Sequence, residues 1–385
     1  MDVQNEAVYI LAFEQGGDEG DERRVVGSEE FLHANGDTSP EPAGRDRVAR
    51  ECERGRMLTG DPLEQLMSRL GTDLDAVNRL IRERMASEHA PRIPEVTAHL
   101  IEAGGKRIRP LLTVAAARIC GYEGPHHLGL AATVEFIHTA TLLHDDVVDE
   151  SSQRRGRPTA NLLWDNQSSV LVGDYLFARA FQLMVEPGNL KVLSILSNAA
   201  AVIAEGEVLQ LAKARSLDMD EATYMQVIRG KTAALFAAAC EAGAEIAGAD
   251  AMHAAALRDY GNALGISFQI ADDLLDYGGK SAQLGKNTGD DFREGKVTLP
   301  VLYALEAAAE EERAFWTRVI ETGDQRDGDL EQALALMQRH GALESTRARA
   351  LDISAEAKAR LEDLPRGELT SLLSDLADFV VSRVV

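Results

Sequence analysis

The sequence has few aromatic residues and few prolines. Phe, Trp and Tyr make up 5% of the 385 residues, and there are 11 prolines. Much of the 45% hydrophobic content comes from Ala and Leu, which favour helices, whereas strands favour aromatic and β-branched residues. No stretch alternates apolar and polar residues as a half-buried strand does. We therefore expect an all-α protein with a substantial core, built as one large domain or two ordinary ones.

Basic residues are too few to balance the acidic ones. Lys and Arg total 40 against 63 Asp and Glu, which gives a net charge of −23. A nucleic-acid backbone or an anionic lipid surface needs a basic protein surface, so neither is expected as a general partner. Basic clusters inside so acidic a chain are therefore informative.

Disulfides and membrane segments are not expected. Cys52, Cys120 and Cys240 are widely spaced and form no CxxC pair, so we interpret them as reduced thiols that fill the core. No apolar run reaches the length of a membrane span, and no signal peptide has the required charged-then-apolar layout. These observations predict a cytoplasmic protein without a transmembrane segment.

Residues 1–56 differ in composition from the rest of the chain. Segments such as EQGGDEGDERR and NGDTSPEPAGRDR are charged, rich in glycine and free of hydrophobic periodicity. Such sequence buries too little apolar surface to fold, so we expect a disordered extension with no chemistry. Alternatively, translation starts at Met57, because helical periodicity takes over from Pro62. Residues 57–385 are expected to form a single domain.

The run Val134–Asp149, VEFIHTATLLHDDVVD, is the segment around which the chain is organised. It ends in Asp145, Asp146 and Asp149. On a helix, positions i and i+4 lie about 40° apart, so Asp145 and Asp149 point the same way. Close carboxylates repel one another unless a cation lies between them, and hard oxygen ligands suit Mg²⁺, which usually accompanies a phosphate-bearing substrate.

The same spacing recurs in Phe268–Tyr277, FQIADDLLDY, at Asp272, Asp273 and Asp276. A single acidic i, i+4 pair would more simply be a solvated helix face. Two copies, each embedded in apolar sequence, argue against that interpretation. Two such helices facing across a cavity could hold a polyphosphate between them through several Mg²⁺ ions.

Three basic segments are candidate anion sites. In GGKRIRP (104–110) the glycines permit close backbone approach and three cations follow them. In SSQRRGRPTAN (151–161) the arginines either balance internal charge or grip phosphate oxygens. In the glycine-rich segment 278–300, Lys286 and Lys296 could close over a bound anion.

Two further motifs have simpler interpretations. The sequence GKT at 230–232 is not a P-loop, because Met225 stands where that signature needs glycine and no strand precedes it. His126 and His127 are expected at the surface. His138 lies two helical turns before Asp145 and is either a core residue or a substrate contact.

These segments, in this order and spacing, resemble the trans-isoprenyl diphosphate synthases, or polyprenyl synthetases. The resemblance covers roughly residues 60–385 and is strongest to the octaprenyl-to-decaprenyl synthases. It implies the isoprenoid synthase fold, an all-α helical bundle around a deep central cavity, and a homodimer. Val297 is a departure, since many members have proline there, and it affects only the stiffness of the loop.

The resemblance also implies roles for individual residues. It gives the Mg²⁺ ligands, for about three ions per active site, as Asp145, Asp149, Asp272 and Asp276. The catalytic set adds Asp146, Asp273, Lys231 and Lys296. The residues that match positions holding an allylic diphosphate are Arg154, Lys231, Thr232, Gln269, Lys286 and Lys296. Those that match the isopentenyl diphosphate site are Lys106, Arg109, His138 and Arg155.

The implied reaction is the Mg²⁺-dependent addition of isopentenyl diphosphate to farnesyl or geranylgeranyl diphosphate, repeated on each product. Ala140 and Thr141 lie about one turn before Asp145, and a bulky aromatic there would close the apolar corridor early. Because both are small, the resemblance implies a product of roughly C40–C50, octaprenyl or decaprenyl diphosphate for the ubiquinone side chain.

Other functions remain open at this point. A geranylgeranyl or farnesyl diphosphate synthase would share the chemistry and stop earlier. A class I terpene cyclase shares the first acidic motif but not the second, nor GGKRIRP and Lys296. A non-catalytic subunit of a two-component synthase would lack the aspartates, whereas this chain keeps all six; turnover by the purified chain distinguishes it.

Overall fold

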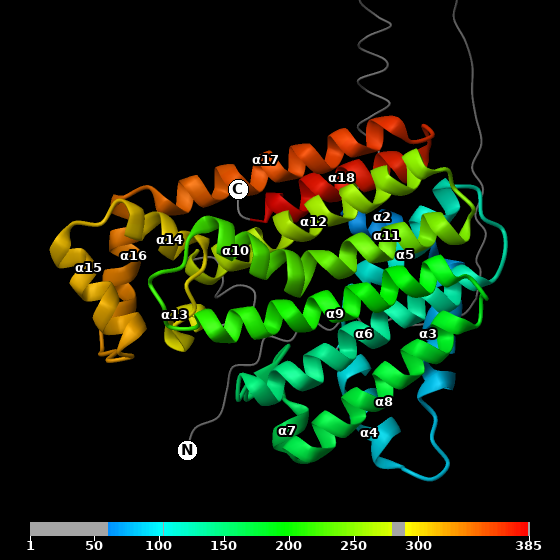
Figure 1. The fold of residues 1–385 in the computed structure, drawn as a ribbon, viewed down its shortest axis with the longest axis horizontal. Helices are drawn as coiled ribbons and strands as arrows, with labels where there is room; N and C mark the ends of the chain where they lie inside the picture. The colour runs from blue at the N-terminus through cyan, green and yellow to red at the C-terminus, as the bar shows by residue number, and fades with distance from the viewer. Residues whose placement is uncertain (1–60, 103, 279–288, 384–385) are drawn as a thin grey trace, which may run out of the picture. The chain divides into compact units, whose positions relative to one another are not determined.

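A computed structural model describes residues 61–102, 104–278 and 289–383 (Figure 1). The segment 1–56, Cys52 and Lys286 lie outside the described residues, so the expectations placed on them stay untested. Gly60–Val385 forms one compact unit. Its described part consists of helices, the loops that connect them and one two-stranded hairpin, so the all-α prediction is confirmed.

Short helices open the described chain. They are α2 (Pro62–Arg69), α3 (Gly71–Met85), α4 (Arg92–Glu102) and α5 (Ile108–Ile119). The Asp61 side chain accepts a hydrogen bond of 2.8 Å from the Leu63 amide, and Pro62 occupies the first turn, which are both strong helix-start signals. The periodic stretch after Pro62 is two helices, because the backbone leaves the helical conformation at Leu70.

Long helices form the centre of this unit and carry both acidic motifs. They are α6 (His126–Val148), α8 (Asn166–Val185), α9 (Leu190–Lys213), α10 (Glu221–Ile228), η1 (Arg229–Ala233), α11 (Ala234–Ile246) and α12 (Ala251–Tyr277). Helix α11 packs against α5, α9 and α12, and α6 packs against α5 and α8. The first acidic motif ends α6 and the second ends α12.

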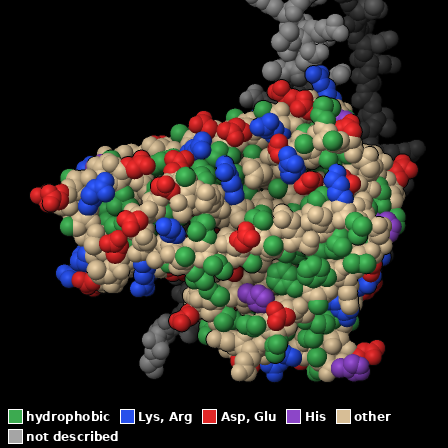
Figure 2. All heavy atoms as spheres, viewed as in Figure 1, with side chains coloured by type: hydrophobic (Ala, Val, Ile, Leu, Met, Phe, Trp, Pro, Cys, Tyr) green, Lys and Arg blue, Asp and Glu red, His purple; other side chains and the backbone are tan. Residues whose placement is uncertain are grey.

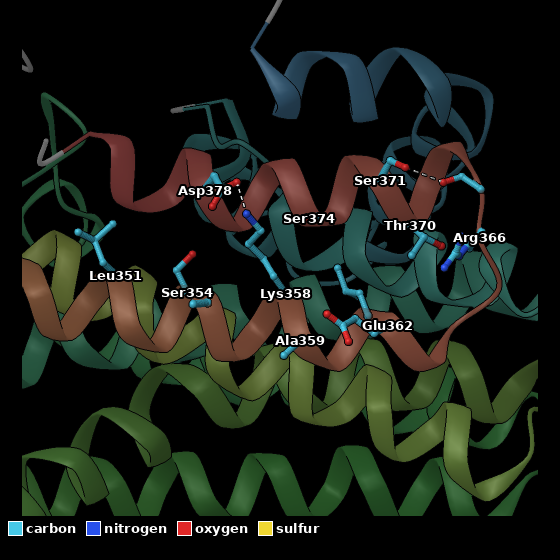
Figure 3. A pocket seen from close by; sticks show the side chains of 13 residues that line it. Leu351, Ser354, Lys358, Ala359, Glu362, Arg366, Thr370, Ser371, Ser374 and Asp378 are labelled. Atoms are coloured by element: carbon cyan, nitrogen blue, oxygen red, sulfur yellow. Dashed lines mark hydrogen bonds and ion pairs between the residues drawn. The ribbon is translucent and has the colours of Figure 1, made fainter. Parts of the chain in front are cut away.

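Shorter helices follow the second motif. They are α13 (Asp290–Glu294), α14 (Leu299–Glu306), α15 (Glu310–Trp316), η3 (Thr317–Glu321), α16 (Asp329–Arg339), α17 (Ala342–Arg360), η4 (Leu361–Asp363) and α18 (Glu368–Ser382). Helices α17 and α18 lie side by side along α12 (Figure 1). A groove of about 510 Å³ runs between them, crossed by the Lys358–Asp378 ion pair (Figure 3). None of the predicted site residues lines it.

The basic segment after the first motif is a hairpin, which the sequence did not predict. Strands β1 (Gln153–Arg154) and β2 (Arg157–Pro158) pair antiparallel, and helix α7 (Ala160–Leu163) follows. Arg155 (φ 53°) and Gly156 (φ 74°) both have positive φ, as a two-residue hairpin turn requires. Each strand is only two residues long, too short to show an alternating pattern.

The expectation that His127 lies at the surface is wrong, although His126 is exposed as expected. His127 is buried, with its ring edge-on to Tyr122 at 5.5 Å and its Nε2 3.5 Å from an Asp73 oxygen. The first turn of α6 packs against α3 there, where Arg118 holds the same carboxylate. Burial lowers the pKa of His127.

The two described cysteines are free thiols, Cys240 buried and Cys120 partly buried. Burial raises the pKa of Cys120 to about 11 and that of Cys240 further. Both are therefore protonated core residues, as the sequence predicted.

The expectation that no run is long and apolar enough to span a membrane needs correction. Among the described residues, α9 passes that test by length and composition, with a mean hydropathy of 1.5. Only 28% of its most apolar stretch is buried. Figure 2 shows hydrophobic side chains gathered over α8 and α9. The exposed ones include Leu171, Phe181, Val185, Leu190, Val208 and Leu211.

Candidate active site

The first acidic motif presents Asp145 and Asp149 to two lysines. Lys231 Nζ lies 3.9 Å from Asp145 Oδ2, and Lys296 Nζ lies 3.5 Å from Asp149 Oδ2. Burial raises the pKa of Asp145 to about 7; Lys231 opposes this rise, and Glu207 and Asp149 add to it. The motif therefore concentrates negative charge that its surroundings neutralise only in part.

Asp146 points away from its two neighbours and into the protein. Its side chain is fully buried, and its Oδ1 accepts hydrogen bonds from Arg154 at 2.7 and 2.8 Å. Its backbone carbonyl accepts from the Ser151 amide and the Asn161 side chain. Asp146 thus ties the β1–β2 hairpin to the end of α6 and holds Arg154 in place.

Lys231 lies in the π-helical turn η1 rather than in a regular helix. Its ammonium donates to Glu207 at 2.8 Å and to Gln210 at 2.9 Å, both on α9. A Cβ on Gly206 would lie 2.7 Å from the Lys231 amide nitrogen, so only glycine lets the two backbones approach this closely. Single π turns are frequent at functional sites, and this one directs Lys231 towards Asp145.

In the second motif, Asp273 is buried and accepts two hydrogen bonds. Tyr224 donates to its Oδ2 and Gln269 Nε2 donates to its Oδ1, each at 2.7 Å. The Thr232 hydroxyl in turn donates to the side-chain Oε1 of Gln269, also at 2.7 Å. Burial raises the pKa of Asp273 to about 7, against the effect of the hydrogen bonds from Tyr224 and Gln269. The predicted residues Thr232 and Gln269 therefore belong to one network with the second motif.

Asp276 caps the next helix. Its two carboxylate oxygens accept hydrogen bonds from the backbone amides of Asp290 (3.2 Å) and Asp291 (3.0 Å) at the start of α13. Burial, and then the charges of Asp273 and Asp276, raise the pKa of Asp291 well above its usual range. This arrangement ties the start of α13 to the second motif.

Lys296 follows α13 and lies beside the first acidic motif. Burial lowers its pKa, but Asp149, Glu294 and Asp291 together raise it above its usual value. The ammonium lies 2.5 Å from Glu294 as well as 3.5 Å from Asp149. Lys296 is therefore a fixed positive charge between the ends of α6 and α13.

A second cluster is positively charged and lies at Arg109, Arg155 and His138. A Cβ on Gly105 would lie 2.9 Å from an Arg155 nitrogen, so the GGKRIRP segment and the hairpin meet here. Arg109 is half-buried and lies over the Phe236 ring at 4.5 Å, and burial lowers its pKa to about 10. Burial, then Arg109 and Arg155, hold the pKa of His138 well below its usual range, so its imidazole is neutral.

One carboxylate faces these arginines from α6. Glu135 is buried, forms an ion pair with Arg107 and raises the pKa of Arg109 and of Arg155 against the effect of burial. The positive charges outnumber it, so the cluster is suited to an anion.

Lys106 packs against α18. Its Nζ lies 5.5 Å above the Phe379 ring, and burial together with Arg383 lowers its pKa. Arg383 itself lies over the Phe268 ring at 5.1 Å, and Asp272 opposes the effect of burial on its pKa. Sequence reasoning missed Arg383, because a single arginine at the end of an amphipathic helix carries no distinguishing pattern.

The small residues before the first motif differ in exposure. Ala140 is fully buried, whereas Thr141 is partly exposed and its hydroxyl donates to the His138 carbonyl at 2.8 Å. In the part of the chain that the structure describes, no three His, Cys, Asp or Glu side chains form a preassembled metal site. The crowded oxygen donors at Asp145 and Asp149 nevertheless fit Mg²⁺, which takes carboxylate oxygens and keeps several waters.

Known proteins share this architecture along almost their whole length. A family profile described as polyprenyl synthetase matches residues 90–337. The chain is 47% identical over 321 residues to the octaprenyl diphosphate synthase of Escherichia coli (strain K12), covering 83% of this chain and 99% of that protein.

Solved structures agree. A decaprenyl diphosphate synthase from Rhodobacter capsulatus has a TM-score of 0.82 and 68% identity, covering 84% of this chain and 99% of that one. A polyprenyl synthase from Caulobacter crescentus CB15, complexed with calcium and isoprenyl diphosphate, has a TM-score of 0.80 and 53% identity over 84% and 98% of the two chains.

Proposed function

Since the chain belongs to the polyprenyl synthetase family, we propose that it adds isopentenyl diphosphate repeatedly to an allylic diphosphate and stops at roughly C40–C50. It is a prenyltransferase of the long-chain trans class. Farnesyl or geranylgeranyl diphosphate would be the primer. Octaprenyl or decaprenyl diphosphate would be the product, made in the cytoplasm for the ubiquinone side chain.

The observation that carries this proposal is that lysines from two other segments lie against the first acidic motif. Lys231 lies beside Asp145, and Lys296 brings the segment after the second motif to Asp149. Alternating carboxylates and ammonium groups suit a diphosphate that arrives with its counter-cations and leaves as an anion.

Asp145, Asp149, Asp272 and Asp276 would hold Mg²⁺, about three ions per active site. When bound, the metal neutralises the diphosphate and makes it a better leaving group. Asp276 would have to exchange its hydrogen bonds to the α13 amides for this role, since both of its oxygens accept from them.

The side chains of the protein would do the rest. Lys231, Lys296 and Arg154 would take up the charge of the departing diphosphate. Arg109, Arg155 and neutral His138 would hold the diphosphate of isopentenyl diphosphate, so that its double bond meets the allylic carbon. The allylic carbon–oxygen bond breaks first, and the double bond of isopentenyl diphosphate then forms the new carbon–carbon bond. The resulting cation loses a proton to the released diphosphate.

A second copy of the chain would cover the exposed apolar face of α8 and α9. Leu171, Phe181 and Val208 are among its exposed side chains, and most of the apolar stretch of α9 is unburied. A face of this kind on a protein with such a net charge is typical of a subunit interface. Phe181→Glu should then convert a dimer to a monomer in analytical ultracentrifugation. Leu351→Glu, exposed on α17, should leave the dimer intact; a wild-type monomer would contradict the proposal.

The decisive experiment measures product length. The full chain is incubated with farnesyl diphosphate, isopentenyl diphosphate and Mg²⁺, and the dephosphorylated products are analysed by mass spectrometry. A series ending at eight to ten units supports the proposal. Termination at four or five units would favour the shorter-chain alternative, and no elongation would refute the catalytic proposal.

A further inference from the structure

Tyr224, on α10, is fully buried close to the second acidic motif, yet it belongs to no motif that the sequence singled out. Its hydroxyl donates a hydrogen bond of 2.7 Å to Asp273 Oδ2 on α12. A buried hydroxyl aimed at a buried carboxylate is costly to lose, because the acceptor would be left unsatisfied.

The hydrogen bond from Tyr224 begins a chain that crosses three elements. Asp273 accepts at its other oxygen from Gln269 Nε2, and Gln269 Oε1 accepts from the Thr232 hydroxyl, each at 2.7 Å. The chain therefore runs from α10 to α12 and on to η1. Every donor and acceptor along it has a defined direction.

The orientation of these hydrogen bonds depends on the Asp273 carboxylate keeping a fixed plane. If the carboxylate turned, the Gln269 amide would lose the acceptor that orients it, and the amide in turn orients the hydroxyl of Thr232. Tyr224 is the second donor, after Gln269, that holds Asp273 in place.

We propose that Tyr224 is a positioning residue for the diphosphate site, which fixes Asp273 and through it orients Gln269 and Thr232. This inference rests on the proposed function, together with the resemblance that matches Gln269 and Thr232 to positions holding the allylic diphosphate. Its chemistry is preorganisation: polar groups held in place before the anion arrives need no rearrangement to bind it.

Tyr224→Phe keeps the ring and removes the hydroxyl. Tyr260→Phe is the matched control, because Tyr260 is equally buried, its hydroxyl donates at 2.7 Å to the Leu373 carbonyl, and it lies about 20 Å before Asp273 along α12. We expect the dissociation constant of inorganic pyrophosphate with Mg²⁺, measured by calorimetry, to rise about tenfold in Y224F and to stay within about twofold in Y260F. The KM for farnesyl diphosphate should follow the same pattern.

The variant Asp273→Asn tests whether Y224F weakens binding by releasing Asp273 or by loosening the core in general. If Tyr224 acts through Asp273, adding Y224F to D273N should weaken pyrophosphate binding by less than about twofold more. Equal pyrophosphate affinities of Y224F and wild type, or a full tenfold effect in the D273N background, would overturn the inference while leaving the proposed function intact. A wild-type protein that does not bind pyrophosphate would overturn both.

Discussion

Lys296 Nζ lies 3.5 Å from Asp149 Oδ2, although 147 residues separate the two in the sequence. The contact joins the end of α6 to the segment that follows α13, and α13 itself begins at the two amides that donate to Asp276 of the second motif. Neither residue depends on the other for its place. Asp149 ends a long helix, and Lys296 is held by its own amide, which donates to the Asp291 carbonyl at 2.9 Å.

Lys296→Met should lower kcat about 10²- to 10³-fold, because it removes a charge placed where the leaving diphosphate develops negative charge. Steady-state consumption of isopentenyl diphosphate measures the effect. Lys191→Met is the control, since Lys191 pairs with Glu245 at 2.6 Å on the surface. A kcat for K296M within a few-fold of the control would contradict this role.

Asp146→Asn should destabilise the fold by about 2–3 kcal/mol, because it leaves Arg154 with a weakened partner at a buried position. The free energy of unfolding in urea measures the loss. Asp378→Asn breaks the exposed pair with Lys358 and should cost less than about 1 kcal/mol. Similar losses in the two variants would mean that Asp146 does not anchor the hairpin.

The pKa of Asp145, raised to about 7 by burial, predicts how stability depends on pH. Between about pH 4 and 7 the folded state keeps a proton that the unfolded state has lost, so this residue makes stability fall as pH rises. Asp145→Asn should remove that contribution, which is at most about 4 kcal/mol above pH 7. The melting temperature of both proteins, followed across this pH range without Mg²⁺, tests it.

Adding Mg²⁺ to the same samples extends the test. A cation beside Asp145 favours its charged form, so Mg²⁺ should stabilise the wild type most near pH 7 and above and affect D145N much less. If the melting temperatures of the wild type and D145N change in parallel with pH in the absence of Mg²⁺, the pKa of the Asp145 carboxyl is not raised in the folded protein. Equal stabilisation by Mg²⁺ would show that the metal binds elsewhere.

Thr141→Tyr should shorten the product towards four or five units, because a large ring one turn before Asp145 would close the corridor. Thr141 is the better site for this change, since Ala140 is fully buried and a ring there would cost about 1–3 kcal/mol of overpacking. Met252→Tyr, on an exposed position of α12, is the control. Mass spectrometry of the products decides, and unchanged lengths in T141Y would remove Thr141 from the chain-length determinants.

Helix periodicity and charge patterns predicted the fold class and both acidic motifs, because those signals are local. The spacing placed Asp145 and Asp149 on one side of the helix, but only the structure shows that the Asp146 side chain is buried against Arg154. What the sequence did not predict has two causes. The β1–β2 hairpin is local, but each strand is only two residues long and carries no pattern. The burial of His127 and the network at Tyr224 depend on contacts between distant segments, which no single-segment pattern encodes.

The place of Arg383 has a practical consequence. Its guanidinium lies over the Phe268 ring at 5.1 Å, and Asp272 opposes the effect of burial on its pKa. The end of α18 therefore acts electrostatically on the second acidic motif. Substitutions that change the charge at the end of α18 are therefore unsuitable as neutral controls for measurements on that motif.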